Sequence, residues 1–409
     1  MGGTHIDATA SRPPGLVSGG HRAENMRRGN ASATLRAILA HGPVSRAEIA
    51  RQTGLSAPCV TKLTGSLIAA GLVRDLAPQA PTDLGRPRIP VRIDARGPVV
   101  LGLHFGLLRT TLGLVGLDGR VHAQTALTHT GRTPRELVDQ AAAGAAAFLA
   151  RHAADRRLLG SSASIGGWVD STEGVVVAHR PLAWTDVPLR AMLSDRLPGP
   201  FRLEQHTRAT AQAELWYGAG READDLVLVF VGNVVDAAVV IDRVIHRGPN
   251  SAAGRIAHLR VDAVSHVRCA CGRTGCLEQV ASDAAVLAAA ADAGLAADDL
   301  DALVALADAG DETADGLLRT RARLVGRAVG TVIDVVNPER VVLAGSVVTE
   351  GAYMDVLRAE AESMVYQGRG VGSRVQATTL GVGALVVSAA APLLADVLCD
   401  PFAYVEDVA

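Results

Sequence analysis

The sequence predicts an α/β protein with a small helical module at the N-terminus and a larger body built from two similar halves. Three observations support this. Short, capped helical segments occupy residues 25–96, strand patterns begin after residue 97, and the order strand, hairpin and helix occurs twice in the body. With 409 residues and 48% hydrophobic content, the chain is not disordered as a whole and can form two or three cores.

Charge is unevenly distributed between the two parts. Residues 1–98 carry 13 Lys and Arg against 6 Asp and Glu, whereas the remainder carries 27 against 36. A basic piece joined to an acidic body is typical of a nucleic-acid-binding module on a larger sensor or enzyme. Residues 1–24 lack an apolar signal segment, so we expect a disordered lead-in and a cytoplasmic protein. The uncharged run 375–395 is rich in small and polar residues and predicts a buried core helix instead of a membrane span.

Two short helices follow the lead-in. Apolar residues at helical spacing predict a first helix that ends at Gly42-Pro43. A second helix begins at Ser45, because Ser45 and Glu48 match a capping box: the serine oxygen accepts from the Glu48 amide, and the glutamate accepts from the Ser45 amide. Gly54 provides the tight turn that ends this helix.

A third helix begins after Ser56, its expected N-cap, and ends at Gly71. Its apolar residues from Val60 to Ile68 form one stripe, which leaves a small, polar side with a single cation facing outward. Helix, glycine turn and helix make a helix-turn-helix, whose second helix enters the major groove of DNA. The expected DNA contacts in these two helices are Ser45, Arg46, Ser56, Ala57, Pro58, Thr61 and Lys62.

Residues 72–74 and 89–93 are expected to pair as the strands of a wing. The loop between them contains Gly85-Arg86-Pro87-Arg88, and an extended Arg-Pro-Arg can insert guanidiniums into a narrow A·T minor groove. We therefore expect Arg86 and Arg88 to contact DNA beside the recognition helix. Two alternatives remain at this point: three-helix modules also bind proteins, and a Gly-Arg-Pro loop can be a solvated turn.

This segment resembles a known family. The run SRAEIARQTGLSAPCVTKLTGSLIAAGLV, followed by GRPR, is similar to the winged-helix N-terminus of the ROK regulators, the repressor branch of a family that includes bacterial sugar kinases. The resemblance implies a repressor of sugar or carbon metabolism genes. We also expect a homodimer or homotetramer whose paired modules bind a pseudo-palindromic operator, flanked by A·T pairs where Arg86 and Arg88 insert.

The body begins with strands at 99–105 and 111–117, an Asp118-Gly119 hairpin turn and a strand from Val121. A helix at 134–152 and a strand at 158–165 complete the first half. The second half repeats the order with strands at 226–231, 237–241 and 244–246. Two such halves predict a two-lobed, actin-like (ribonuclease-H-like) fold, and the ROK resemblance extends over residues 30–395, including the segment 336–345.

His258, Cys269, Cys271 and Cys276 predict a structural zinc site, because three thiolates and one imidazole complete a tetrahedron. The ROK zinc motif looks the same, including the following Leu277-Glu278. No position is left open for hydrolysis, so the zinc should be architectural. The alternative is three free cysteines in a surface loop.

The sequence departs from the ROK kinases at each position that phosphotransfer needs. Where the family has Asp-x-Gly-Gly-Thr, this chain has a segment that begins at His104 and contains Leu107 and Leu108. Gln205-His206-Thr207-Arg208 aligns with Asn-Asp-Ala-Asn, so His206 replaces the general base, and Gly232-Asn233-Val234 replaces the second phosphate turn. These losses predict a body that is not an enzyme.

The sugar site also differs from the family pattern, because Arg255 replaces a glutamate that grips sugar hydroxyls. A remaining cleft with this composition favours an anionic sugar derivative, such as a sugar phosphate or sugar acid. Arg255 could equally point to the surface and leave a vestigial site. The expected effector-binding residues are Gln205, His206, Arg208, Arg255, His258 and Glu278. Two other functions stay open: a divergent sugar kinase fused to a DNA-binding domain, and a DNA- or partner-binding protein without a ligand.

Overall fold

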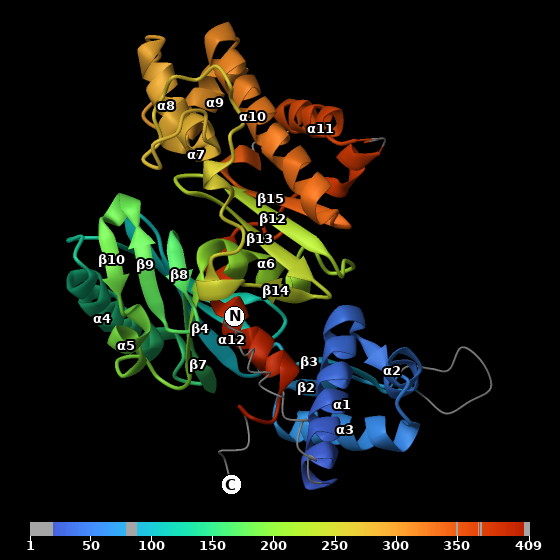
Figure 1. The fold of residues 1–409 in the computed structure, drawn as a ribbon. Helices are drawn as coiled ribbons and strands as arrows, with labels where there is room; N and C mark the ends of the chain where they lie inside the picture. The colour runs from blue at the N-terminus through green and yellow to red at the C-terminus, as the bar shows by residue number, and fades with distance from the viewer. Residues whose placement is uncertain (1–18, 79–87, 349–350, 367, 369, 405–409) are drawn as a thin grey trace, which may run out of the picture.

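The computed structural model describes residues 19–78, 88–348, 351–366, 368 and 370–404. Figure 1 shows a small N-terminal module beside a body of two lobes, with α12 running between the module and the lobes. The α/β fold class and its two-lobed body are as the sequence predicts. The lead-in expected over residues 1–24 lies mostly outside the described residues, although α1 already begins at Gly19.

The module contains three helices and a small antiparallel sheet of order β1-β3-β2. The predicted helix ends and wing strands are confirmed, but the first helix is longer than the short helix that the sequence indicated. The bounds are α1 Gly19–His41, β1 Val44–Ser45, α2 Arg46–Thr53, α3 Ala57–Ala69, β2 Val73–Asp75 and β3 Pro90–Ile93.

Local capping explains where α2 and α3 begin. The Ser45 Oγ accepts from the Glu48 amide at 3.2 Å, and the Ser56 Oγ accepts from the Cys59 amide at 3.4 Å. Gly54 has φ +70° between the two helices, as expected. The capping box is only half formed, because the Glu48 carboxylate accepts from the side chains of Arg51 and Gln52 instead of the Ser45 amide.

Each lobe of the body has a five-stranded mixed sheet. The first sheet has the order β11-β7-β4-β5-β6 and the second β14-β13-β12-β15-β16, and both combine antiparallel hairpins with parallel crossovers. The repeated strand-hairpin-helix order predicted from the sequence is therefore confirmed. The strands are β4 Val99–Phe105, β5 Arg109–Gly116, β6 Val121–Thr128, β7 Leu158–Ile165, β11 Phe201–Gln205, β12 Leu226–Val231, β13 Val235–Ile241, β14 Val244–His246, β15 Arg340–Gly345 and β16 Val375–Ala377.

Helices cover the outer faces of both sheets. A further small sheet, β8 Trp168–Asp170, β9 Val175–His179 and β10 Trp184–Val187, extends the first lobe (Figure 1). The helices of the body are α4 Pro134–His152, α5 Leu189–Ser194, α6 His206–Tyr217, α7 Leu277–Ala281, α8 Asp283–Asp292, α9 Leu300–Asp308, α10 Glu312–Val336, α11 Ala352–Met364 and α12 Ala384–Cys399.

The uncharged run 375–395 is not one helix: the expected buried core helix is confirmed from Ala384 onward, but it is wrong for the first part of the run. Its first residues form β16 at the edge of the second sheet, and α12 begins only after Gly383, which has φ +101°. The backbone hydrogen bonds of β16 with β15 hold the first part extended. In the described ranges, no helix has the length and apolar character that crossing a membrane requires.

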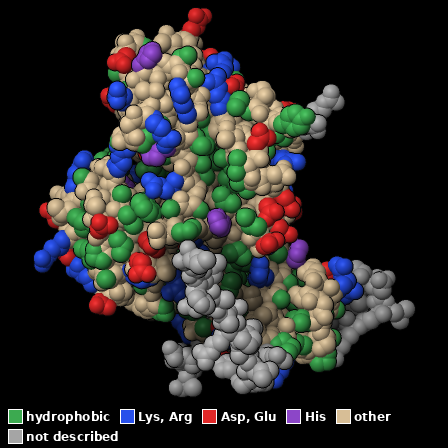
Figure 2. Space-filling model, in the orientation of Figure 1, with side chains coloured by type: hydrophobic (Ala, Val, Ile, Leu, Met, Phe, Trp, Pro, Cys, Tyr) green, Lys and Arg blue, Asp and Glu red, His purple; other side chains and the backbone are tan. Residues whose placement is uncertain are grey.

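The core of the module is continuous with the core of the body. Leu35 and Ile38 of α1 belong to the same buried cluster as Leu394 and Val397 of α12. Basic and acidic side chains are interspersed over the lobes on the face shown in Figure 2. Because the cluster crosses the boundary near residue 97, the orientation of the module is coupled to the body through α12.

Candidate DNA-binding face, metal centre and ligand cavities

The outward side of α3 carries the residues expected to contact DNA. Val60, Leu63 and Leu67 are buried against the module. The opposite side presents small or polar side chains with one cation, which permits close approach to base edges. Its exposed members are Ser56, Ala57, Pro58, Thr61 and Lys62.

The remaining expected DNA contacts have different positions. Ser45 caps α2, and Arg46 is half-buried, with its Nε donating to Thr64 Oγ1 at 3.0 Å and its Nη2 pairing with Asp75 at 2.9 Å. Arg46 therefore connects α2 to α3 and the wing, which limits its reach toward DNA. Arg88 is exposed beside β3, and Arg86 lies outside the described residues.

The expected metal ligands converge at one point. The donor atoms of His258, Cys269, Cys271 and Cys276 all lie within 4.8 Å of one another. The Cys269 Sγ is 3.4 Å from His258 Nδ1, and the Cys271 and Cys276 sulfurs are 3.6 Å apart. A tetrahedral zinc with bonds of about 2.3 Å to sulfur has edges of about 3.7 Å, so this cluster fits such an ion.

Gly275 makes this tight geometry possible. Its φ is +72°, and a Cβ at this position would lie within 1.8 Å of the Asp262 carbonyl oxygen. Only glycine can therefore bring Cys276 back beside the other ligands. Since Leu277 begins α7 immediately after, the cluster anchors that helix and with it Glu278.

A cavity of about 130 Å³ is lined by residues of the three segments in which the sequence departs from the ROK kinases. His104 at the end of β4 and His206 at the start of α6 meet there with ring centroids 4.6 Å apart, and Phe230 packs edge-on against His206 at 4.5 Å. The structure thus brings together two of the positions at which the sequence departs from the kinases. None of the lining residues within the described chain is an aspartate or glutamate.

The histidines of this cavity are kept neutral by burial. Burial lowers the pKa of His206 to about 4, and that of His179, across the cavity, to about 4. Burial, with a smaller contribution from His206, also lowers the pKa of His104. The His206 Nδ1 is buried without a hydrogen-bond partner in the described chain. Imidazoles with such values are weak bases at neutral pH.

These pKa values predict acid sensitivity. Between pH 6.5 and about 4 the unfolded chain binds protons at His206 and His179 and the folded chain does not, so stability falls as the pH falls through that interval. We expect each affected histidine to remove about 1.4 kcal/mol per pH unit. His206→Asn should flatten the pH dependence of the melting temperature over this range, whereas His152→Asn at an exposed position should not. An unchanged slope in His206→Asn would contradict this account.

A neighbouring cavity contains three of the expected effector residues. Arg255, His258 and Glu278 line it, and His258 also belongs to the metal cluster. The Arg255 guanidinium lies 4.7 Å from the ring centre of Trp168, so it stacks on the cavity wall although it is exposed. Arg255 therefore lies along the wall of this cavity and does not point away from it.

Asp236 is a cavity residue that the sequence analysis missed. Burial raises its pKa to about 7, and its Oδ2 accepts a hydrogen bond from Gln205 Nε2 at 2.9 Å. A carboxyl group near half protonation can donate to or accept from a ligand hydroxyl. A lone aspartate within the apolar strand β13 was the available signal.

Two expected effector residues use their side chains for hydrogen bonds within the fold instead. Arg208 is 3% exposed, pairs with Glu204 at 2.7 Å, and donates to the carbonyl oxygens of Val169 and Ser251. Burial alone would raise the pKa of Glu204, but Arg208 and Arg247 hold it below its ordinary value. The structure therefore does not support a ligand contact by Arg208. Gln205 is buried and donates to Thr207 and Asp236.

Comparison with known proteins agrees with this geometry. A sequence model of the ROK family matches residues 100–394. A transcriptional regulator from Mycobacterium tuberculosis is 36% identical over 344 residues, which cover 78% of this chain and 75% of the relative. The DNA-binding transcriptional dual regulator NagC of Escherichia coli is 28% identical over 328 residues, which cover 78% of this chain and 80% of NagC.

Solved structures share the fold. A ROK family transcriptional regulator, a homologue of the E. coli Mlc protein, matches with a TM-score of 0.77 at 23% identity and covers 93% of this chain and 100% of that one. A ROK family glucokinase from Streptomyces griseus, solved with glucose and AMPPNP, matches with a TM-score of 0.61 at 24% identity and covers 71% of this chain and 98% of its own. The family model and the relatives together show that this chain belongs to the ROK family.

Proposed function

We propose that the protein is a DNA-binding transcriptional repressor of sugar or carbon metabolism genes. The observation that carries this proposal is the exposed face of α3, which is small and polar with one lysine, beside a wing and attached to a ROK body. The names of the relatives support it, since they are transcriptional regulators.

In this proposal phosphate contacts set the register, and α3 reads the major groove through Ser56, Ala57, Pro58, Thr61 and Lys62. Arg86 and Arg88 reach the flanking A·T minor groove. A homodimer, or a homotetramer made of two dimers, presents paired modules to a pseudo-palindromic operator. Ser45 and Arg46 support the recognition helix and lie near the DNA backbone.

The body is proposed to be catalytically inactive. Phosphotransfer needs a carboxylate to accept the hydroxyl proton and a loop that approaches phosphate closely. Histidines with low pKa values line the cavity formed by the segments that differ from the kinases, and Leu107 lines it as well. We expect purified protein to transfer no phosphate from ATP to glucose or N-acetylglucosamine in a coupled assay. Turnover that copurifies with the protein and is lost in His206→Asn would revive the kinase alternative.

Zinc is the metal that fits the Cys269 cluster best. Three sulfurs and one imidazole nitrogen at tetrahedral spacing match its preferred ligands. All four positions are supplied by the protein, so the ion would anchor α7 and hold His258 at the edge of the ligand cavity. It would contribute to the fold and would not take part in catalysis.

The effector is proposed to be a sugar or sugar derivative bound in the cavity beside the metal cluster. Asp236, His258 and Glu278 offer groups for hydroxyls, and Arg255 favours an anionic substituent such as a phosphate or a carboxylate. His206 lies in the adjoining cavity. A ligand that favours one arrangement of the lobes would change the spacing of the paired modules, because α12 connects the two parts.

The experiment that tests this function is a titration of purified protein against genomic DNA fragments around its own gene, by gel shift in moderate salt. We expect tight, salt-sensitive binding to a discrete fragment, which a sugar derivative then weakens. Binding no stronger than that to random DNA would overturn the proposal and favour a partner-binding module.

A further inference from the structure

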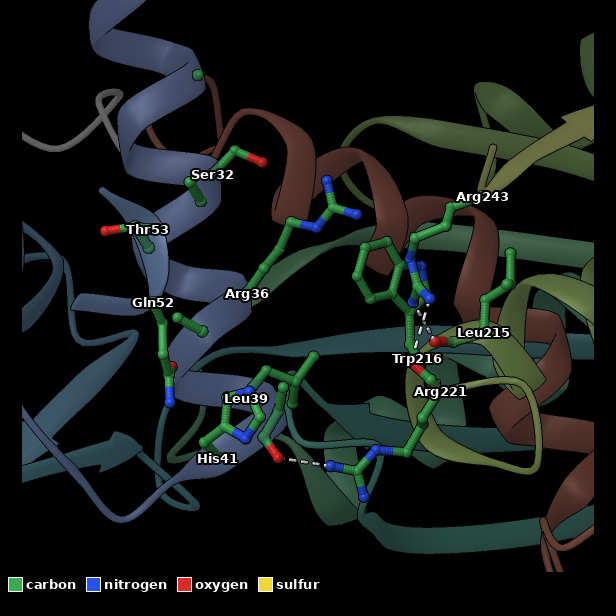
Figure 3. A pocket seen from close by; sticks show the side chains of 14 residues that line it. Ser32, Arg36, Leu39, His41, Gln52, Thr53, Leu215, Trp216, Arg221 and Arg243 are labelled. Carbon is green, nitrogen blue, oxygen red and sulfur yellow. Dashed lines mark hydrogen bonds between the residues drawn. The ribbon is translucent and has the colours of Figure 1, made fainter. Parts of the chain in front are cut away.

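A third cavity, of about 540 Å³, lies between the DNA-binding module and the body (Figure 3). Residues of α1 and the end of α2 form one wall, and the end of α6, Arg221 and Arg243 form the other. Its volume is within the range of small-molecule sites. It shares no lining residue with the two cavities between the lobes.

Its walls carry three guanidiniums from three different elements. Arg36 comes from α1 in the module, Arg221 follows α6, and Arg243 lies at the turn between β13 and β14. None of the described residues that line the cavity is an aspartate or glutamate. The cavity therefore has a net positive charge without compensation from its own walls.

Trp216 brings two of these charges together. The guanidinium carbon of Arg36 lies 4.8 Å from the centre of the Trp216 ring, and the guanidinium carbon of Arg243 lies 5.6 Å from it. Each cation is attracted to the ring, but the two like charges repel each other. Burial lowers the pKa of Arg243 and the charge of Arg36 lowers it further, whereas Asp224, which does not line the cavity, acts in the opposite direction. The buried Trp216 Nε1 finds no acceptor in the described chain.

Hydrogen bonds within the fold use only some of the donors of these three guanidiniums. Arg221 donates to the Ala40 carbonyl oxygen at 2.7 Å, and Arg243 donates to the carbonyl oxygens of Leu215, Arg221 and Ala223. The side chain of Arg36 has neither a hydrogen bond nor a salt bridge within the part of the chain that the structure describes. A guanidinium has five donors, so most of the donors on Arg36 and Arg221 remain available to a ligand.

We infer that this cavity binds a small polyanion that carries phosphate or carboxylate groups, held by Arg36 from the module and by Arg221 and Arg243 from the body. The geometry of guanidinium suits both groups. Because the ligand would contact both sides of the boundary, it would favour the docked orientation of the module. That consequence for operator binding rests on the proposed function, whereas anion binding itself does not.

Isothermal titration of the full chain tests this inference directly. Pyrophosphate and citrate are titrated separately at constant ionic strength, so that the two arms distinguish phosphate from carboxylate. We expect one site per chain for at least one probe, weakened at least 10-fold by Arg36→Gln and unchanged by Arg323→Gln on the exposed side of α10. Arg36 is the cleanest position because its side chain has no hydrogen bond to lose.

A second variant and a fluorescence signal distinguish loss of the anion site from misfolding. Ala40→Glu places a carboxylate on the exposed cavity wall and should also weaken binding at least 10-fold, provided that the melting temperature stays that of the wild type. Binding should alter the tryptophan emission, and Trp216→Phe should remove that change. Absence of binding of both probes at millimolar concentration, or binding that neither Arg36→Gln nor Ala40→Glu affects, would overturn the inference. Neither result depends on whether the protein binds DNA.

Discussion

Lys62→Glu is expected to lower the affinity for the operator about 100-fold while leaving the fold intact. Lys62 is exposed on α3, so its replacement removes no packing contact. Loss of one DNA contact costs about 1–3 kcal/mol, and the new carboxylate repels the phosphates, which together correspond to about two orders of magnitude in the dissociation constant. The measurement is a gel shift or fluorescence anisotropy titration at several salt concentrations.

The matched control for this experiment is Arg323→Glu. It makes the same change in net charge at an exposed position on α10, in the second lobe. We expect it to leave the affinity within a few-fold of the wild type. An equal loss in both variants would mean that only the overall charge matters, and no loss in Lys62→Glu would exclude α3 as the recognition helix.

Cys276→Ser is expected to cause the largest loss of stability of any single substitution considered. Cys276 is fully buried and supplies one of four ligands in a cluster that positions both α7 and His258. Binding of structural zinc supplies about 10 kcal/mol or more in small zinc domains. In this larger body, which has its own core, we expect the melting temperature to fall by roughly 10 °C.

Metal analysis provides the second readout. Wild-type protein should contain one zinc per chain, and a strong chelator should lower its melting temperature to that of Cys276→Ser. Cys399→Ser, at an exposed cysteine outside the cluster, is the control and should change neither value. Wild-type protein that is free of zinc, yet as stable as after zinc is added back, would contradict an architectural metal.

Elements with a strong local signal were predicted to the residue. The strand Val99–Phe105 is a continuous apolar run, and the helix Pro134–His152 has a complete capping box at Thr133 and Glu136. The residues that set the hydrophobic period and the capping residues lie within a few positions of each other, so no distant contact is needed to specify these two elements. The metal ligands were equally predictable from the sequence, because three cysteines within eight positions have few roles other than metal binding.

Prediction was less successful where a residue had a choice of partners. The run 375–395 has a uniform composition, but pairing with β15 makes its start a strand. Arg208 has the chemistry of a ligand contact, yet Glu204 and two carbonyl oxygens from distant segments consume its donors. Asp236 gains its raised pKa from burial that no local pattern reveals.

The sequence by itself determined the order of elements, the family, the cluster of three cysteines and one histidine, and the histidines at positions 104 and 206, because each depends on residues close together in the chain or on residue identity. Only the tertiary structure decided which charged groups keep hydrogen-bond donors or acceptors available for a ligand. The shared core of α1 and α12, and the meeting of Arg36, Trp216 and Arg243, join segments more than 170 residues apart. Burial and charge compensation are properties of such assembled neighbourhoods, and they decide whether an arginine holds the fold together or remains available to bind a ligand.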